Sequence, residues 1–261
     1  MKIINRFKLP EKLQIEDLDH ASVSLLHAEI IQSKRFLRKL YIDFYHILKA
    51  AIRVENSSTA TIVELGSGGG FVKDVIPCAI TSDVLRLLSV DMVFSAMQMP
   101  FEEQSVDAFV MIDVLHHIPD VSAFFVEVIR CLAPGGRVIM IEPANTVWGR
   151  FIYKNFHHEP FDPKADWKFE SKGPLSSANG ALPWIIFHRD RDFFEKEFPQ
   201  LKIIKLEFHT PFRYLCSGGF TLRQLTPSWT YGMVKGIETI LSPLNRWIGM
   251  FETIVLEKTS N

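Results

Sequence analysis

Short apolar segments rich in Val and Ile alternate with polar connectors between residues 60 and 142. Their lengths of four to six residues are typical of buried strands. A helical pattern over Val121–Cys131 stops at Pro134-Gly135-Gly136, where a new strand begins. Repeated units of this kind predict an α/β fold with a parallel sheet and right-handed crossovers. The predicted strands cover residues 60–65, 79–82, 90–94, 107–112 and 137–141.

Two connectors in this region are short. Gly70 to Pro77 leaves room for barely two helical turns, and only six residues separate Asp83 from Val90. A helical crossover between parallel strands normally takes about a dozen residues. This edge of the sheet is therefore expected to lack a full helix.

Residues 22–54 repeat apolar positions at three- and four-residue steps, with basic residues between them. They predict a helix, followed by a loop at Asn56–Thr59, so that residues 1–58 form an N-terminal helical cap. A basic amphipathic helix lying on a membrane is the alternative interpretation.

Residues 143–200 break the alternation and are rich in aromatic residues, Pro, His and Gly. We expect them to be an insertion over the carboxyl end of the sheet, where open α/β sheets bind ligands. They belong to a main domain of residues 59–261, which also has a predicted helix at 189–198 and strands at 201–208 and 251–256. Helices within 221–249 are expected to break at Pro227 and Pro243.

The first strand ends in Glu64 and runs into a glycine turn, Gly66-Ser67-Gly68-Gly69-Gly70. Glycines let a strand turn sharply and let backbone N–H groups approach a ligand. The dinucleotide fingerprint G-x-G-x-x-G would need glycine at Phe71. The spacing thus favours another adenosine-containing ligand over NAD.

Asp83 ends the second strand, seventeen residues after Gly66. A carboxylate at this place can accept hydrogen bonds from the two hydroxyls of a ribose. Alone it would be read as a turn residue, but the glycine turn before it favours the ribose interpretation.

Four further segments follow in order after the turn. They are Met99-Pro100-Phe101, Ser105–Phe109, Val114–Asp120 and Leu132–Arg137. With the glycine turn, they make residues 60–142 resemble the class I S-adenosylmethionine-dependent methyltransferases. The small-molecule branch typified by ubiquinone and menaquinone biosynthesis methyltransferases is the most similar.

The resemblance implies a Rossmann-like sheet of seven strands whose last strand is antiparallel, with S-adenosyl-L-methionine as cofactor. Asp83 would hold the ribose, and Asp113 would line the sulfonium side of the pocket. Residues beside the methionine part would be Glu64, Gly66, Ser67, Gly68 and Gly70, and those beside the adenine Ser95, Ala96 and Met97. Ser95 departs from the family pattern, which usually has an acidic residue near the adenine amino group.

Methyl transfer in line with the methyl–sulfur bond needs alignment of the acceptor and exclusion of water. An oxygen acceptor also benefits from a general base. We expect His117, and after it His116, to be that base, because both follow a strand end; packing and turn capping are the alternative roles. Weaker candidates are Glu142, His157 and His158.

The composition limits the kinds of ligand and partner that the protein is expected to bind. A net charge of −1 provides no basic field for a nucleic acid, and three widely spaced cysteines fit reduced thiols better than disulfides or a metal site. No signal core or spanning segment is visible, so a cytoplasmic location is expected.

We therefore expect O- or C-methylation of a small, partly apolar acceptor. Methylation of RNA or protein and an inactive cofactor-binding scaffold stay open. The apolar C-terminal region, with Trp229, Met233, Ile240 and Trp247, is expected to pack on the sheet or in a homodimer; peripheral membrane contact is the alternative.

Overall fold

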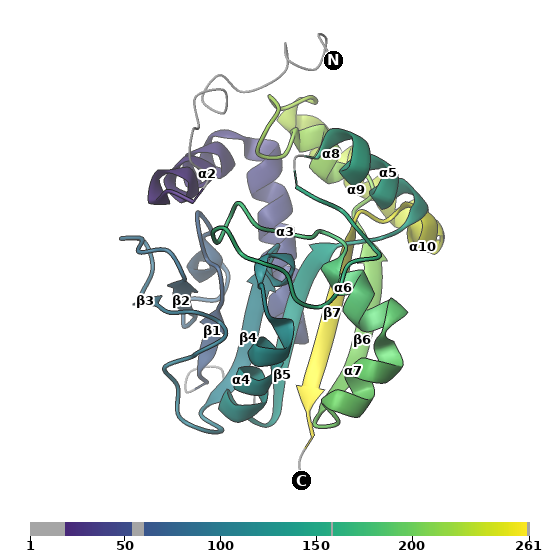
Figure 1. Cartoon of the computed structure of the whole chain (residues 1–261). Helices are drawn as coiled ribbons and strands as arrows, with labels where there is room; N and C mark the ends of the chain where they lie inside the picture. Colours follow the sequence, from purple (N-terminus) through teal and green to yellow (C-terminus); the bar gives the residue numbers. More distant parts are fainter. Residues whose placement is uncertain (1–18, 54–59, 158, 260–261) are drawn as a thin grey trace.

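The computed structural model describes residues 19–53, 60–157 and 159–259, and its centre is a seven-stranded sheet (Figure 1). The strand order is β3-β2-β1-β4-β5-β7-β6, and β7 runs antiparallel to both of its neighbours. This confirms the predicted α/β methyltransferase sheet with an antiparallel last strand. The strands are β1 Ile62–Glu64, β2 Ile80–Asp83, β3 Met92–Val93, β4 Val106–Ile112, β5 Leu132–Pro143, β6 Leu201–His209 and β7 Phe251–Lys258.

Helices cover both faces of the sheet, with α3 (Arg35–Ala51) behind it and α4 (Val121–Cys131) and α7 (Arg191–Glu197) in front (Figure 1). The apolar stripe of α3 is buried in one core cluster with side chains of β1, β4 and β5. The apolar side chains of α4 pack with those of α7 and the other face of the sheet. The second half of the N-terminal helical segment is therefore a layer of the main fold.

The expected single helix over residues 22–54 is wrong in one respect, because Lys34 divides it into α2 (Ala21–Ser33) and α3. Lys34 has extended backbone angles, φ −93° and ψ 91°. Its buried ammonium donates to the carbonyl oxygens of Gly219 (2.6 Å) and Leu222, and burial lowers its pKa to about 8. This tertiary contact overrides the local helical pattern. The loop predicted at Asn56–Thr59 lies outside the described residues.

The two short connectors behave as expected. A single 3₁₀ turn, η2 (Val72–Asp74), follows the glycine turn, and no helix lies between β2 and β3, where every residue is described. Helix α4 has the predicted bounds; the Asp120 side chain accepts from the Ala123 amide at its start.

Of the short helices after β5, α5, α8, α9 and α10 lie at the carboxyl end of the parallel strands, whereas α6 and η4 pack with α7 on the front face of the sheet (Figure 1). The predicted helix at 189–198 begins only at Arg191, because a π-helical segment, η4, precedes it. The elements are α5 Val147–Phe156, α6 Leu182–Trp184, η4 Ile185–Arg189, α8 Arg213–Ser217, η5 Ser228–Thr230, α9 Tyr231–Ile240, η6 Ser242–Leu244 and α10 Asn245–Ile248.

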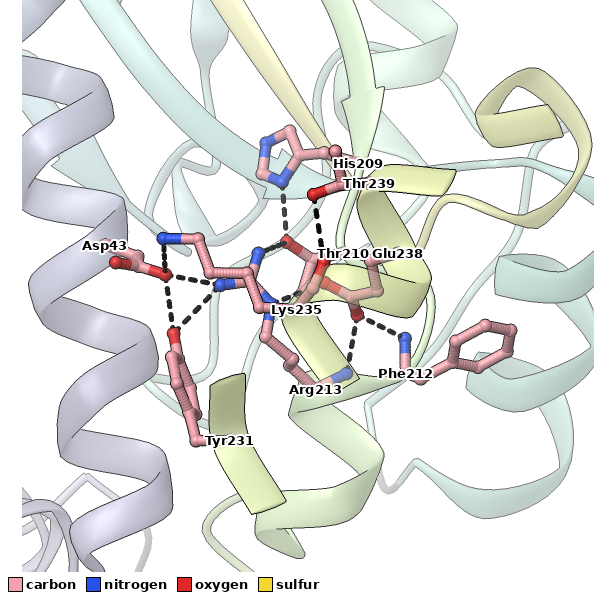
Figure 2. Close-up of polar contacts among 9 residues, drawn as sticks. All are labelled: Asp43, His209, Thr210, Phe212, Arg213, Tyr231, Lys235, Glu238 and Thr239. Carbon is pink, nitrogen blue, oxygen red and sulfur yellow. Dashed lines mark hydrogen bonds and ion pairs between the residues drawn. The ribbon is translucent and has the colours of Figure 1, made fainter. Parts of the chain in front are cut away.

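A cluster of charged side chains around the buried Arg213 and Glu238 fixes α8 and α9 to α3 (Figure 2). We call it the Arg213 cluster; its members are Asp43, Arg213, Tyr231, Lys235 and Glu238. The Arg213 guanidinium binds the Glu238 carboxylate and donates to Asp43 Oδ2 at 2.5 Å. Lys235 Nζ lies 2.8 Å from the same Asp43 oxygen. Two cations thus balance two carboxylates.

The C-terminal apolar residues do not pack on the sheet as expected. Trp229 is 79% exposed, Ile240 78% and Met233 59%, whereas Tyr231 is buried in the Arg213 cluster. Burial against the sheet is therefore wrong for these three side chains. Among the described residues, no helix is both long and apolar enough to cross a membrane.

Candidate functional site

The glycine turn joins the tip of β1 to the tip of β2. Gly66 and Gly68 have φ values of +65° and +47°, a region that side chains with a Cβ rarely adopt. A Cβ on Gly66 would also lie 2.5 Å from the Val114 side chain. The Ser67 amide donates to the Ser82 carbonyl oxygen at 2.8 Å, which holds the turn against β2.

The other two glycines allow close helix packing. A Cβ on Gly69 would lie 2.3 Å from the Ala28 nitrogen of α2, and one on Gly70 would lie 2.5 Å from the Tyr45 hydroxyl of α3. Helix α2 therefore lies directly over the turn.

A cavity of about 410 Å³ opens at this end of the sheet between the glycine turn, α2 and the segment after β5. Residues from α2, α3, the tips of β1, β2 and β4, and the 143–200 segment line it. All the predicted site residues lie on its wall, although they come from four separate stretches of sequence. They are Glu64, Gly66, Ser67, Gly68, Gly70, Asp83, Ser95, Ala96, Met97, Asp113, His116 and His117.

The cavity wall is acidic. Four carboxyl groups line it, and no Lys or Arg is among the described lining residues. We call these four the cavity acids: Glu64, Asp83, Asp113 and Glu159. Such a wall favours a cationic ligand.

Two of the cavity acids are poorly solvated. Burial raises the pKa of Glu64 to about 7, and within the described residues its Oε2 has no hydrogen-bond partner. Burial likewise raises the pKa of Asp113 to about 8, with Glu142 adding to the effect and His116 opposing it. Asp113 also has φ +56°, a strained value of the kind found at functional sites. The unpaired Oε2 of Glu64 on the cavity wall is explained by a ligand that supplies its hydrogen-bond partner.

Asp83 is oriented by the backbone around it. Its Oδ2 accepts from the Gly68 amide at 2.9 Å and its Oδ1 from the Leu85 amide at 2.8 Å. Each carboxylate oxygen has a further lone pair available for a ligand hydroxyl. Burial raises the Asp83 pKa, and the amides of Leu85, Gly68 and Val84 oppose that shift.

Ser95 lies in a tight turn after β3, where the Gln98 amide donates to the Ser95 carbonyl oxygen. Its hydroxyl oxygen accepts from the Met97 amide at 3.2 Å, which fixes the Ser95–Met97 segment on the wall. A hydroxyl at this position offers a neutral acceptor rather than a charged one.

His116 lies between two carboxylates. Its Nδ1 is 2.6 Å from Glu142 Oε2 and its Nε2 is 3.4 Å from Glu159 Oε2. Although burial favours the neutral ring, these carboxylates raise the His116 pKa well above its usual value. Glu142 also accepts from the amides of Val114 and Leu115, so β5 positions the turn that carries both histidines.

His117 has the opposite character. Burial and the neighbouring His116 charge lower its pKa to about 4, so its ring is neutral at physiological pH. Its Nδ1 donates to the Ser177 carbonyl oxygen at 3.1 Å, which leaves the Nε2 lone pair facing Glu159 Oε1 at 3.6 Å. Of the two histidines, His117 is the one in the protonation state of a base.

Glu159 is the residue that sequence reasoning missed. Its neighbours His157 and His158 were candidates, but the carboxylate beside them was not. Glu159 contacts both His116 and His117, and the histidines lower its pKa strongly against the effect of burial. His157 Nδ1 lies 3.6 Å from Glu159 Oε2, and His158 lies outside the described residues. Its place as a carboxylate in an aromatic, histidine-rich segment is the sequence signal that could have identified Glu159 as a site residue.

Four tyrosines of the wall were also not predicted: Tyr41 and Tyr45 from α3, Tyr153 from α5 and Tyr214 from α8. Their side chains come from elements far apart in sequence, so no local motif marks them. They give part of the cavity wall an aromatic surface.

Comparison with known proteins identifies a domain in this part of the chain. Residues 63–140 match the family described as "Methyltransferase domain". No curated protein matches the chain. These residues hold the glycine turn, Asp83, Asp113 and both histidines, so the resemblance to methyltransferases is confirmed for this domain.

Solved structures share the fold at low identity. A methyltransferase in complex with the Haloferax volcanii Trm112 activator is 15% identical, with 93% of this chain and 97% of that one covered and a TM-score of 0.52. A SAM-dependent methyltransferase from Archaeoglobus fulgidus is 13% identical, with 85% and 94% covered and a TM-score of 0.52. These likenesses show the class I fold, while the ubiquinone and menaquinone branch stays a resemblance.

Proposed function

We propose that this chain, a methyltransferase by the domain in residues 63–140, uses S-adenosyl-L-methionine to methylate a small, partly apolar acceptor. The observation that carries the proposal is the acidic cavity over the glycine turn. S-adenosylmethionine carries a sulfonium and an ammonium group, and the cavity acids would offset these charges. When bound, it supplies the electrophilic methyl group.

The residues present fit this cofactor. The unpaired Glu64 Oε2 and the backbone of Gly66, Ser67, Gly68 and Gly70 would hold its methionine part. Asp83 would hold the ribose, Ser95, Ala96 and Met97 the adenine, and Asp113 would face the sulfonium side. Helix α2 over the turn would exclude water.

The acceptor would lie on the aromatic side of the cavity. Tyr153, Phe161, Tyr214 and Phe251 line that wall, and aromatic walls favour flat or lipid-like ligands. His117, as the neutral ring, would take a proton from a hydroxyl acceptor, while His116 would position Glu159. Both O- and C-methylation fit this arrangement.

The proposed domain boundaries also depend on which segments line the cavity. We propose residues 59–261 as the methyltransferase domain, 143–200 as its substrate-facing insertion and 1–58 as a helical cap. Two observations support this division. Helix α2 packs directly on the glycine turn, and residues 153–180 contribute to the cavity wall. The cytoplasmic location stays a prediction.

A membrane-associated form of the same activity has one observation in its favour. Exposed apolar side chains gather on α5 and on the segment from η5 to α10, among them Phe151, Trp229, Met233 and Ile240. Co-sedimentation with liposomes would distinguish membrane contact from a homodimer, which sedimentation velocity would detect.

Gly68→Ala tests the cofactor site. The added methyl group would force a strained φ at the turn and occupy the space over the backbone, so we expect at least a tenfold loss of S-adenosylmethionine affinity by isothermal titration calorimetry. Gly236→Ala is the matched control, because a Cβ there meets no atom within 4 Å. Equal affinities for the two variants would contradict the site.

A methyl-transfer assay distinguishes an active enzyme from an inactive cofactor-binding scaffold. Labelled S-adenosylmethionine would be offered with quinol, sugar, fatty-acid and polyketide acceptors. Transfer of label to any acceptor supports the proposal. Normal cofactor binding without transfer to any class would favour the inactive scaffold.

A further inference from the structure

His116, His117 and Glu159 bring three metal-ligating groups to one point of the cavity wall. Their ligand atoms all lie within 4.8 Å of one another. The Nε2 atoms of the two histidines face the two different oxygens of Glu159, at 3.4 Å and 3.6 Å. All three side chains are largely buried, with exposed fractions of 2%, 15% and 18%.

In each imidazole, Nδ1, the nitrogen that does not face Glu159, contacts an oxygen atom. His116 Nδ1 contacts Glu142 Oε2 at 2.6 Å, and His117 Nδ1 donates to the Ser177 carbonyl oxygen at 3.1 Å. In metal sites, a ligating histidine almost always makes such a contact through its other nitrogen, which orients the ring. Here the two contacts turn both Nε2 atoms toward the same place.

The spacing also fits coordination. Ligands about 2.0–2.2 Å from a metal lie roughly 3–3.5 Å from one another around it. The two Nε2–carboxylate distances are close to this range. They exceed the 2.7–2.9 Å that is typical of a charge-assisted hydrogen bond.

We propose that His116, His117 and Glu159 bind one divalent transition-metal ion, with its remaining coordination positions facing the cavity. Two imidazoles and one carboxylate suit Zn²⁺, Fe²⁺, Mn²⁺ or Co²⁺, whereas Mg²⁺ and Ca²⁺ prefer oxygen ligands alone.

The metal would define the acceptor class, an inference that rests on the proposed function. An open coordination position binds an oxygen donor, such as a hydroxyl or an enolisable carbonyl. Coordination lowers the pKa of a hydroxyl, whose proton then leaves to water. Ligation replaces the role of His117 as a base, because its Nε2 cannot serve both purposes.

Zinc titration tests the site without any methyl transfer. The full chain would be treated with a chelator, desalted and titrated with Zn²⁺ by calorimetry at pH 7.5, with native mass spectrometry for stoichiometry. We expect one ion per chain. Co²⁺ substitution is expected to give the visible absorption of a site with nitrogen and oxygen ligands.

Glu159→Gln and Glu195→Gln form a matched pair of variants. Both remove one carboxylate charge, but Glu195 is 47% exposed on α7. Glu159→Gln is expected to weaken Zn²⁺ binding at least tenfold, and Glu195→Gln to leave it unchanged. Circular dichroism would check that each variant is folded.

Two results would overturn the proposal: no stoichiometric Zn²⁺ binding by the unmodified chain, or equal binding by the two variants. Calorimetry with S-adenosylmethionine on the same samples reports on the proposed function separately. Cofactor binding without metal binding rejects only the metal site, and metal binding without cofactor binding rejects only the cofactor.

Discussion

Two groups of charged side chains, each with buried members, differ in whether every charge has a partner of opposite sign. In the Arg213 cluster, each carboxylate faces a cation and accepts several hydrogen bonds (Figure 2). Of the cavity acids, only Asp113 and Glu159 have histidines as basic neighbours among the described residues, and Glu64 Oε2 has no hydrogen-bond partner among them.

The pKa shifts follow the same division. The pKa of Asp43 is lowered, because contacts with Lys235, Tyr231 and Arg213 outweigh burial. The pKa values of Glu64 and Asp113 are raised by burial. None of the Arg213 cluster lines the cavity, whereas all four cavity acids do. Balanced buried charge therefore fixes helices in place, and unbalanced buried charge marks a ligand site.

Arg213→Met would break the balanced cluster and have the largest expected effect. It leaves the buried Glu238 carboxylate without its cation, which costs about 3–5 kcal/mol of unfolding free energy. Urea denaturation would measure the loss. Arg191→Met, at an exposed pair with Glu195, should cost less than about 0.5 kcal/mol. Similar losses in both variants would contradict a structural role for the cluster.

Glu64→Gln should have the opposite effect on stability. The raised pKa means that folded Glu64 keeps its proton between about pH 4.5 and 7, while the unfolded chain loses it. The free energy of unfolding therefore falls as pH rises through this window. Removing the charge should stabilise the ligand-free chain by about 2–3 kcal/mol at pH 8.

The same variant should bind S-adenosylmethionine more weakly, because the ligand loses a carboxylate. Urea denaturation at pH 5 and pH 8 and calorimetry would check both effects. A variant that is less stable at pH 8 than the unmodified chain would show that Glu64 is structural, like Glu238.

Ser95→Asp is expected to have the smallest effect. It adds a fifth carboxyl group to the wall, at the place where a charged acceptor would replace a neutral one. A gain of about 1 kcal/mol, or roughly fivefold in cofactor affinity, is expected. Asp can also keep the contact that the Ser95 hydroxyl makes with the Met97 amide. Unchanged affinity would place the adenine elsewhere.

Much of the fold could be predicted because its signals are local. A few consecutive residues determine each of the features that were predicted, namely the ends of the strands, the glycine turn and the end of α4. The break at Lys34 could not be predicted, since it depends on carbonyl oxygens of Gly219 and Leu222, far along the chain.

The cofactor side of the site was predictable for the same reason, because its residues follow strand tips. Glu159 was not, because it meets His116 only through the folding of the segment after α5. The positive φ of Asp113 and the missing partner of Glu64 Oε2 are likewise properties of the folded chain alone.

The central claim, that an acidic cavity holds a cationic cofactor, is tested most directly by calorimetry with S-adenosylmethionine from pH 6 to pH 8.5. Glu64 and Asp113, with pKa values of about 7 and about 8, ionise over this range. We expect binding of one cofactor per chain, with affinity that rises with pH and a weaker rise in Glu64→Gln. Absence of binding by folded protein at every pH would contradict it.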